Sequence, residues 1–278
     1  MRWTPSGRSR NLEDRRGMGG LGKGLGIGGT VIVLALSLLT GRNLFNDLGV
    51  EPGAVAGTGS PMTPEDSARE ETEVQFVSFV LDDNDSTWQK VLARYNQPYA
   101  APKLVLFRNS TQSGCGYAQS AMGPFYCPVD QKIYIDLGFY EELKSKFGAS
   151  GDFAQAYVLA HEFGHHIQHL LGTDAEVRQA QGGNPQDANQ LSVRLELQAD
   201  CFAGVWANTT QKRSILDQGD VEEAMTAASS VGDDRIQQQT GQRVNVDAFT
   251  HGSAAQRMEW FGRGYKSGDP RACNTFSS

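Results

Sequence analysis

The chain has 278 residues, of which 39% are hydrophobic and 21% charged, a composition typical of a globular protein long enough to bury a substantial core. Its net charge of −7 and pI near 5.3 exclude the broadly basic surface of a general nucleic-acid-binding protein, so no nucleic-acid partner is expected. The charge is unevenly distributed, because residues 1–24 carry six basic side chains against two acidic ones.

An uncharged stretch, GLGIGGTVIVLALSLLTG, follows this basic segment directly. It is close to the shortest length that spans a bilayer as a helix, and the basic residues before it favour a cytoplasmic N-terminus. We therefore expect a basic cytoplasmic tail at residues 1–24, a single-pass transmembrane signal-anchor at residues 25–41, and an extracytoplasmic remainder. A cleaved signal peptide is the alternative, although no A-x-A-like cleavage site follows.

The rest of the chain divides into a linker and one domain. Residues 42–73 are rich in Gly, Pro, Ser, Thr and acidic residues, which predicts a flexible linker. A globular domain is expected at residues 74–278. Its apolar spacing from Val77 to Leu92 predicts one or two helices, and KLVLFR (103–108) and KIYIDL (132–137) are typical of strands.

The second half of this domain is expected to be helical. A helical run begins at FYEELKSKFG (139–148). Longer helices are predicted at residues 153–172, 190–210 and 221–239 from their apolar periodicity. Because few strands are followed by many helices, the pattern indicates an α+β fold.

Four cysteines, Cys115, Cys127, Cys201 and Cys273, contain no C-x-x-C pair, which disfavours a cysteine metal site. If the domain lies outside the cytoplasm, disulfides are the default. We expect Cys115–Cys127 to close a local loop and Cys201–Cys273 to tie the C-terminal tail to the core. Four buried thiols are the alternative.

Four of the five histidines lie at residues 161–169, inside one predicted helix. In the run H-E-F-G-H, His161 and His165 are four residues apart on one helix face, so their imidazoles can converge on one ion. Neutral imidazole suits Zn²⁺, and Glu162 is close enough to act on a metal-bound water without being a ligand, which is the zinc-peptidase signature. An amphipathic helix with exposed histidines is the alternative.

The remaining histidines of this helix are not expected to be ligands. His169 continues the same face but lies about 12 Å from His161 along the helix axis. His166 points roughly 100° away from its neighbour His165 around the helix. Both are expected to lie on the helix surface or to support the ligands.

A catalytic zinc needs a third protein ligand and an open position for water. The next helix offers E-L-Q-A-D, Glu196 to Asp200, among apolar neighbours. Acidic side chains in such surroundings usually meet a cation. We expect Glu196 to be the third ligand and Asp200 to accept the free N–H of a ligating imidazole, with Asp200 the next choice as ligand. A solvated acidic face is the alternative.

These motifs resemble a known family. HEFGHHIQ followed by ELQADCFAG is similar to the gluzincin pattern, and residues 74–276 resemble the bacterial neutral zinc metallopeptidases, the YpfJ-like group. The resemblance implies a zincin-like domain with a small β-sheet over the active-site helix.

A more local similarity is to the membrane-bound M48 peptidases, in the helix of Glu196 and in T-H-G-S-A-A-Q-R, which resembles their T-H-P-x-x-x-x-R. It implies that His251 donates a hydrogen bond to the developing oxyanion, although Gly252 stands where those enzymes have proline. A capping or core histidine is the alternative for His251, and Tyr265 is a weaker candidate for the same role.

We therefore predict a membrane-anchored, zinc-dependent peptidase that acts on a peptide or protein substrate. Its Zn²⁺ is held by His161, His165 and Glu196, and Glu162 is the general base. The strand KIYIDL is expected to pair with an extended substrate. The alternative is a catalytically silent, tethered zinc-binding scaffold for envelope proteins. A purely structural zinc site would want four protein ligands, and no cysteine has suitable spacing.

Overall fold

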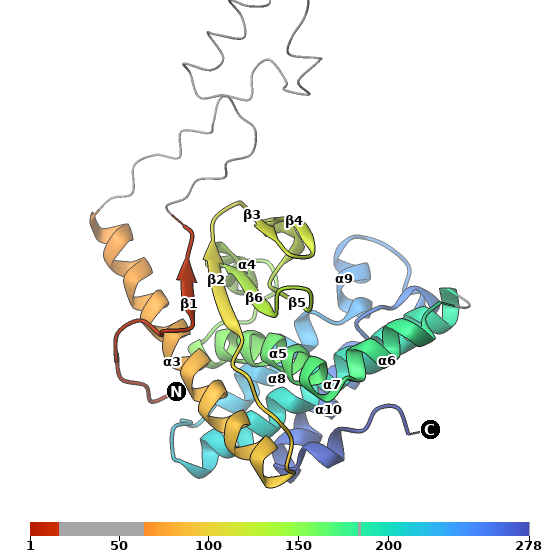
Figure 1. Cartoon of the computed structure of the whole chain (residues 1–278). Coiled ribbons are helices and arrows are strands. Elements are labelled where there is room, and N and C mark those ends of the chain that lie inside the picture. The colour runs from red at the N-terminus through yellow and green to blue at the C-terminus, as the bar shows by residue number, and fades with distance from the viewer. Residues whose placement is uncertain (17–63, 183–184, 278) are drawn as a thin grey trace, which may run out of the picture.

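The computed structural model describes residues 1–16, 64–182 and 185–277 (Figure 1). The predicted transmembrane segment, residues 25–41, lies outside the described residues. Among the helices within those ranges, none combines the length and the apolar character that a bilayer crossing requires. Helices and a small sheet together form the predicted α+β architecture.

A four-stranded sheet has the order β1-β2-β6-β5, formed by β1 (Leu12–Asp14), β2 (Lys103–Phe107), β6 (Lys132–Asp136) and β5 (Phe125–Cys127). The first three strands are parallel and β5 is antiparallel to β6. A separate hairpin joins β3 (Ser110–Ser113) to β4 (Gly116–Gln119). Both faces of β2 and β6 are buried, as their nearly continuous apolar sequences require.

Helices make up most of the remaining fold. They are α3 (Pro64–Arg94), α4 (Gly138–Ser145), α5 (Asp152–Leu171), α6 (Thr173–Ala180), α7 (Pro185–Lys212), α8 (Asp220–Ser230), α9 (Asp233–Gln239) and α10 (Ala254–Ser267). Three 3₁₀ turns are η1 (Ser120–Met122), η2 (Val246–Ala248) and η3 (Pro270–Cys273).

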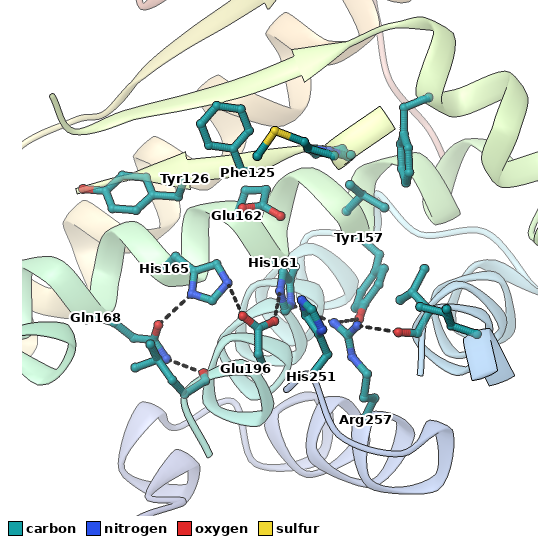
Figure 2. Close-up of a pocket in the computed structure, with 18 of the residues that line it drawn as sticks. Phe125, Tyr126, Tyr157, His161, Glu162, His165, Gln168, Glu196, His251 and Arg257 are labelled. Carbon is teal, nitrogen blue, oxygen red and sulfur yellow. Dashed lines mark hydrogen bonds and ion pairs between the residues drawn. The ribbon is translucent and has the colours of Figure 1, made fainter. Parts of the chain in front are cut away.

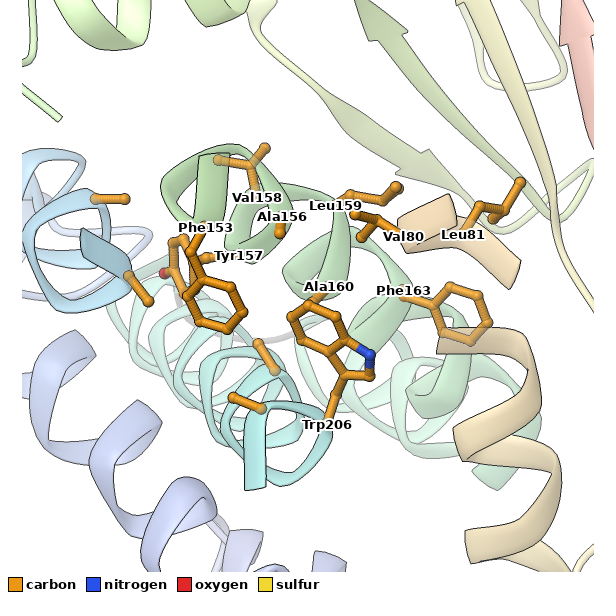
Figure 3. Close-up of a cluster of buried hydrophobic side chains, with 14 of the residues drawn as sticks. Val80, Leu81, Phe153, Ala156, Tyr157, Val158, Leu159, Ala160, Phe163 and Trp206 are labelled. Carbon is orange, nitrogen blue, oxygen red and sulfur yellow. The ribbon is translucent and has the colours of Figure 1, made fainter. Parts of the chain in front are cut away.

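Helix α5 lies at the centre of the fold, below the sheet in Figure 1 and packed against α3, α7 and α8. Its apolar face meets Trp206 of α7, whose ring stacks on Phe153 at a centroid distance of 5.5 Å (Figure 3). Phe163 lies on the same side of α5 and is fully buried. The opposite face, which carries His161 and Glu162, is thereby held toward the pocket.

Gly164 sets how closely α5 and α7 approach. A Cβ atom at this position would lie 2.9 Å from the backbone oxygen of Ala199 and 3.0 Å from its Cα atom. Only glycine therefore allows this contact between the two helices. Since Gly164 lies between His161 and His165, the close approach also brings α7 up to the histidine face.

Both predicted disulfides are present. Cys115 is bonded to Cys127, and Cys201 to Cys273. The first closes the loop that contains β4, and the second ties η3, near the C-terminus, to the middle of α7. The two bonds therefore fix one loop and the C-terminal segment to the folded body.

The N-terminal segment departs from the predicted organisation. Residues 1–16, expected to be a separate tail, pack against the domain through β1, and the ring of Trp3 lies 5.3 Å from that of Phe76. Residues 64–73, expected in the flexible linker, form the first turns of α3. Basic residues of the segment bind acids of that helix, as in the 2.8 Å pair of Arg16 with Glu70. The acid-rich composition from which a linker was predicted therefore belongs to the first turns of α3, where basic residues of the N-terminal segment bind the acidic side chains.

Strand β1 pairs with β2 residue by residue, from Leu12 opposite Leu104 to Asp14 opposite Leu106. Residues 25–41, which carry the predicted membrane crossing, lie outside the described residues, so the single-pass arrangement with residues 1–24 cytoplasmic and the domain outside stays a prediction.

Three smaller predictions also need correction. KIYIDL forms β6, an inner strand between β2 and β5, so it has no edge for a substrate; β5 is the edge strand on that side of the sheet. The predicted helix 221–239 is two helices, α8 and α9, separated by Gly232, whose backbone is extended with φ −69° and ψ 142°. The stretch after residue 172, for which no helix was predicted, contains α6.

Candidate metal centre

Helices α5 and α7 bring the three predicted ligands together (Figure 2). The Nε2 atom of His161 lies 3.1 Å from one carboxylate oxygen of Glu196, and the Nε2 atom of His165 lies 3.4 Å from the other. One donor atom from each of the three residues lies within 4.8 Å of the other two. Two imidazole nitrogens and a carboxylate oxygen in this arrangement are a donor set that suits Zn²⁺.

The far side of each imidazole is fixed by a hydrogen bond. His161 Nδ1 lies 2.8 Å from an oxygen of Asp200, and His165 Nδ1 lies 2.9 Å from the side-chain oxygen of Gln168. Since both partners accept hydrogen bonds here, each Nδ1 carries a proton, and each Nε2 is the atom that would bind a metal ion at the centre. The residues present therefore fit a metal ion.

Gln168 was not assigned a role from the sequence. Its amide nitrogen donates to the backbone oxygen of Leu195 at 2.6 Å and to the side chain of Gln198 at 3.1 Å. These bonds leave the amide oxygen to face His165. The available signal was its position three residues after His165, on the same face of α5.

Asp200 occupies the position that was predicted for it, and it is completely buried. Arg257 of α10 binds both of its oxygens, with Nε and Nη2 donating at 2.8 and 2.9 Å, and the hydroxyl of Tyr157 donates to it as well. Burial raises the pKa of Asp200, but the charges of Arg257 and His161 outweigh it and lower that pKa to about 2. Asp200 is therefore an anion that holds His161 in one tautomer.

The centre itself attracts positive charge. Burial alone would lower the pKa of His161, but the charge of Asp200 and hydrogen bonds to Asp200 and Glu196 raise it to about 10. The pKa of Glu196 lies well below its usual value, because the two imidazoles outweigh the cost of burial. A cation placed between these three side chains would be stabilised by the same charges.

Glu162 lies beside the centre and lines the pocket without belonging to the ligand cluster. Its side chain is directed toward the same pocket as His161 (Figure 2). Burial raises the pKa of Glu162, opposed by the nearby imidazoles of His165 and His161. A buried carboxyl group with a raised pKa is a stronger base than an exposed one, as proton abstraction requires.

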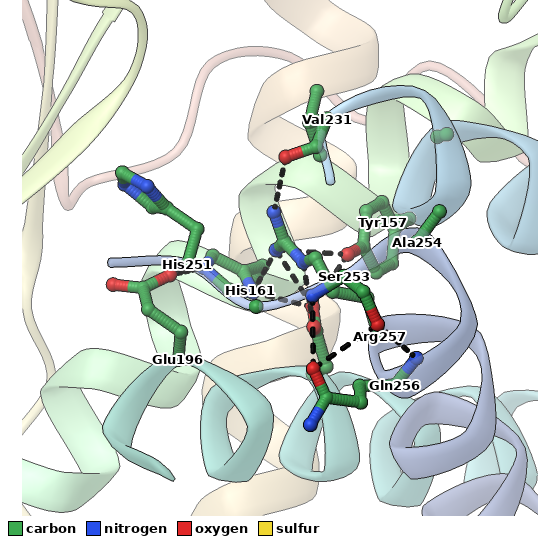
Figure 4. Close-up of polar contacts among 12 residues, drawn as sticks. Tyr157, His161, Glu196, Val231, His251, Ser253, Ala254, Gln256 and Arg257 are labelled. Atoms are coloured by element: carbon green, nitrogen blue, oxygen red, sulfur yellow. Dashed lines mark hydrogen bonds and ion pairs between the residues drawn. The ribbon is translucent and has the colours of Figure 1, made fainter. Parts of the chain in front are cut away.

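His251 reaches the pocket from the loop between η2 and α10, and Figure 4 shows it beside Glu196. Its Nδ1 atom lies 3.4 Å from a carboxylate oxygen of Asp233, and that hydrogen bond raises the pKa of His251. The other oxygen of Asp233 accepts the backbone N–H groups of Thr250, His251 and Gly252. A raised pKa favours the protonated imidazole, which can donate to an oxyanion.

Gly252 explains the departure from the T-H-P pattern. Its φ angle is +89°, which proline cannot adopt. A Cβ atom there would also lie 3.2 Å from Leu197. Glycine is therefore required by the local turn that directs His251 toward the pocket.

The other candidates lie elsewhere. His166 is fully buried, so the surface position is wrong for it: Nε2 lies 2.7 Å from the backbone oxygen of Ala100 and Nδ1 lies 3.1 Å from the hydroxyl of Tyr126. His169 lies 3.0 Å from Asp174. Tyr265 does not line the pocket, and its ring stacks on Phe261 instead.

The pocket has a volume of about 560 Å³ and runs along α5. Phe125 and Tyr126 of β5 cover the side opposite Glu196 (Figure 2). A sheet edge above a helix that carries the candidate ligands can accommodate an extended peptide between them.

The comparisons with known proteins agree with this geometry. The model of the family described as "Putative neutral zinc metallopeptidase" matches residues 1–276. The protein YpfJ of Escherichia coli strain K12 is 48% identical over 289 residues, which cover 99% of each chain. The protein Rv2575 of Mycobacterium tuberculosis strain H37Rv is 47% identical over 205 residues, which cover 70% of this chain and 67% of that protein. Both relatives are described as uncharacterized, and no solved structure matches the chain.

Proposed function

We propose a function on the premise that this chain belongs to the neutral zinc metallopeptidase family: it is a peptidase that hydrolyses peptide bonds at the α5–α7 centre. His161, His165 and Glu196 would hold the zinc ion. Once bound there, zinc would supply Lewis acidity, which polarises a carbonyl group and makes water more acidic. The local similarity to M48 peptidases is not shown by these matches and stays a prediction.

The chain's own residues supply the proton transfers. Glu162 takes a proton from the attacking water and delivers it to the leaving amine, which its raised pKa favours. His251 donates a hydrogen bond to the carbonyl oxygen as negative charge develops on it. Asp200 and Gln168 keep the two ligating imidazoles oriented throughout.

One observation carries the proposal. The Nε2 atoms of His161 and His165 converge on Glu196, while each Nδ1 atom is engaged by an acceptor on the far side of its ring. Histidines that are merely exposed on an amphipathic helix would not need to be held in this orientation.

The test separates binding from catalysis. Glu162→Gln should keep one zinc per chain and reduce peptide cleavage by at least 1000-fold, because the base is lost while the ligands remain. Metal content and chelator-sensitive cleavage of a peptide library measure the two effects. Glu142→Gln, a change of the same kind in the same pocket, is the matched control and should remain active.

An active Glu162→Gln protein would remove this residue from the mechanism. Zinc bound without cleavage, even in the unchanged protein, would favour the silent scaffold instead. That alternative leaves a buried carboxyl group beside the centre without a role.

We also propose an extracytoplasmic location for the folded body. All four cysteines of the chain form disulfides, which are typical of oxidising compartments. The pairing of β1 with β2 supports the same location for residues 1–16. Attachment to a membrane through residues 25–41 stays a prediction. Mass spectrometry after thiol blocking in intact cells would contradict the location if it found the cysteines reduced.

A further inference from the structure

The two ends of the pocket differ in chemistry. One end is walled by apolar side chains from four helices and the segments beside them: Phe139, Phe147, Val158, Val231 and Ile236. The other end, called the polar end below, contains the polar side chains of Gln168, Asp174 and Arg178 beside Tyr126 and Leu195. Such a groove distinguishes the two directions of a bound peptide.

Helix α5 shows how close each end lies to the centre. Val158 comes three residues before His161 and four before Glu162, so it lies on the next turn of the same helix face. Gln168 lies three residues after His165, on the turn at the other side. Each end therefore lies about 5 Å along the helix from the ligands, within reach of the first substrate side chain on its side of the cleaved bond.

The apolar end offers little to a charged side chain. Two charged residues line it or lie beside it, and both already have partners: Glu142 binds Lys146 at 3.0 Å, and Arg257, which donates to the backbone oxygen of Val231, binds Asp200. Phe139 closes the space under the loop at Gly123, where a Cβ atom would lie 3.8 Å from its ring. A large apolar side chain would lose its contact with water there without leaving a polar group unpaired.

Asp174 gives the polar end a different character. One of its carboxylate oxygens binds His169 at 3.0 Å and Arg178 at 2.8 Å. The other oxygen is buried and has no hydrogen-bond partner. A peptide N–H group or a cationic side chain is the kind of group that this oxygen can accept.

Strand β5 sets the direction of the substrate. It begins near the apolar end, since Gly123 lies just before it and next to Phe139. It then runs toward the polar end, where the ring of Tyr126 lies 5.5 Å from that of His166 and 6.1 Å from that of His169. Its pairing with β6 is antiparallel, and no other described strand occupies its second edge.

An extended peptide that pairs antiparallel with β5 therefore runs from the polar end to the apolar end. Its C-terminal half lies beside Val158. The residue that follows the cleaved bond then faces the apolar wall.

We propose, on the basis of the peptidase function above, that the substrates carry a large apolar side chain directly after the cleaved bond. Phe139, Phe147, Val158, Val231 and Ile236 determine this preference. Leucine, phenylalanine and similar residues are selected at that position, and aspartate and glutamate are rejected.

The experiment is cleavage of a degenerate peptide library by the zinc-loaded full chain, with the new N-termini and C-termini read by mass spectrometry. We expect leucine or phenylalanine at the first position of the C-terminal products, about 10- to 100-fold above alanine, as burial of one large apolar side chain predicts. The last position of the N-terminal products should show no comparable apolar enrichment.

Two charge variants test the wall itself. Ile236 is 36% exposed at the rim of α9, so a charge is tolerated there without disturbing the core. Ile236→Asp should shift the preferred residue after the cleaved bond toward lysine and arginine, and Ile236→Lys toward aspartate and glutamate. Tyr117→Ala, which removes an exposed aromatic side chain outside the pocket, is the control and should keep the original preference.

The outcomes separate this inference from the function on which it rests. Cleavage without a preference after the cleaved bond, or with the apolar preference before it, would overturn the inference and leave the peptidase intact. Unchanged preferences in both Ile236 variants would overturn the assignment of the wall. No cleavage by the zinc-loaded protein would overturn the peptidase and this inference together.

Discussion

At the scale of single residues, the candidate centre depends on hydrogen bonds that fix the histidines. Asp200, on the neighbouring helix α7, orients His161. Gln168, one turn further along α5, orients His165. The convergence of His161 and His165 was predictable because two positions four residues apart share a helix face. Arg257 ends the motif T-H-G-S-A-A-Q-R, but its contact with Asp200 was not predictable, because it joins residues 57 positions apart.

His166 gives a prediction for pH dependence. Burial lowers its pKa to about 4, below the value near 6.5 of an unfolded histidine. Between pH 6.5 and pH 4 the unfolded chain therefore binds a proton that the folded chain does not. The stabilising contribution is complete above pH 6.5 and is lost as the pH falls toward 4, by about 3 kcal/mol.

Denaturant unfolding at several pH values measures this effect. His166→Gln should lose that part of the slope between pH 6.5 and 4. Tyr126→Phe, which removes only the hydroxyl partner, should keep most of it because burial is the main cause. Equal slopes for His166→Gln and the unchanged protein would contradict the assignment.

At the scale of elements, long helices were predictable and short elements were not. The periodicity that predicts α5 and α7 extends over five or more turns. Strand β5 contains only three residues, Phe125 to Cys127, too few to show an alternating pattern. Its position at the sheet edge follows from pairing with β6, so the edge strand could not be told from KIYIDL in the sequence.

Gly164 provides the test of helix packing. Gly164→Ala should push α7 away from α5, because the new methyl group would overlap the backbone of Ala199. We expect a loss of about 1–3 kcal/mol in the free energy of unfolding and weaker zinc binding, since Glu196 moves with α7. Chemical denaturation and chelator competition measure the two changes.

Gly262→Ala is the matched control for this variant. Gly262 is also a buried helix residue, but a Cβ atom there makes only an ordinary 3.5 Å contact with Met225. It should keep zinc affinity unchanged. If Gly164→Ala behaved in the same way, the close approach of the helices would not position Glu196.

At the scale of the whole molecule, residues 1–16 pack against strands and helices that lie far from them in the sequence. Three residues, Leu12 to Asp14, form β1, and nothing in so short a stretch predicts a strand. Basic residues from which the membrane topology was predicted bind acidic side chains of the folded body, as Arg8 binds Glu71. Sequence composition could not predict these ion pairs, because a pattern of charges does not indicate which acidic residue each basic residue binds.

The Arg16–Glu70 pair tests this docking. Its atoms are 2.8 Å apart and both side chains are largely buried. Arg16→Glu and Glu70→Arg should each destabilise the full chain, and the double variant should recover about 1 kcal/mol relative to their sum. Thermal or denaturant unfolding of the four proteins gives this coupling energy. Strictly additive effects would show that the two residues do not meet.

Zinc stoichiometry of the full chain tests the central claim most directly. Metal analysis after removal of loosely bound ions should give one zinc per chain for the unchanged protein. Glu196→Ala should reduce zinc affinity by at least 100-fold, whereas Glu142→Ala should leave it unchanged. One tightly held zinc in Glu196→Ala, or none in the unchanged protein, would contradict the claim that His161, His165 and Glu196 together hold the ion.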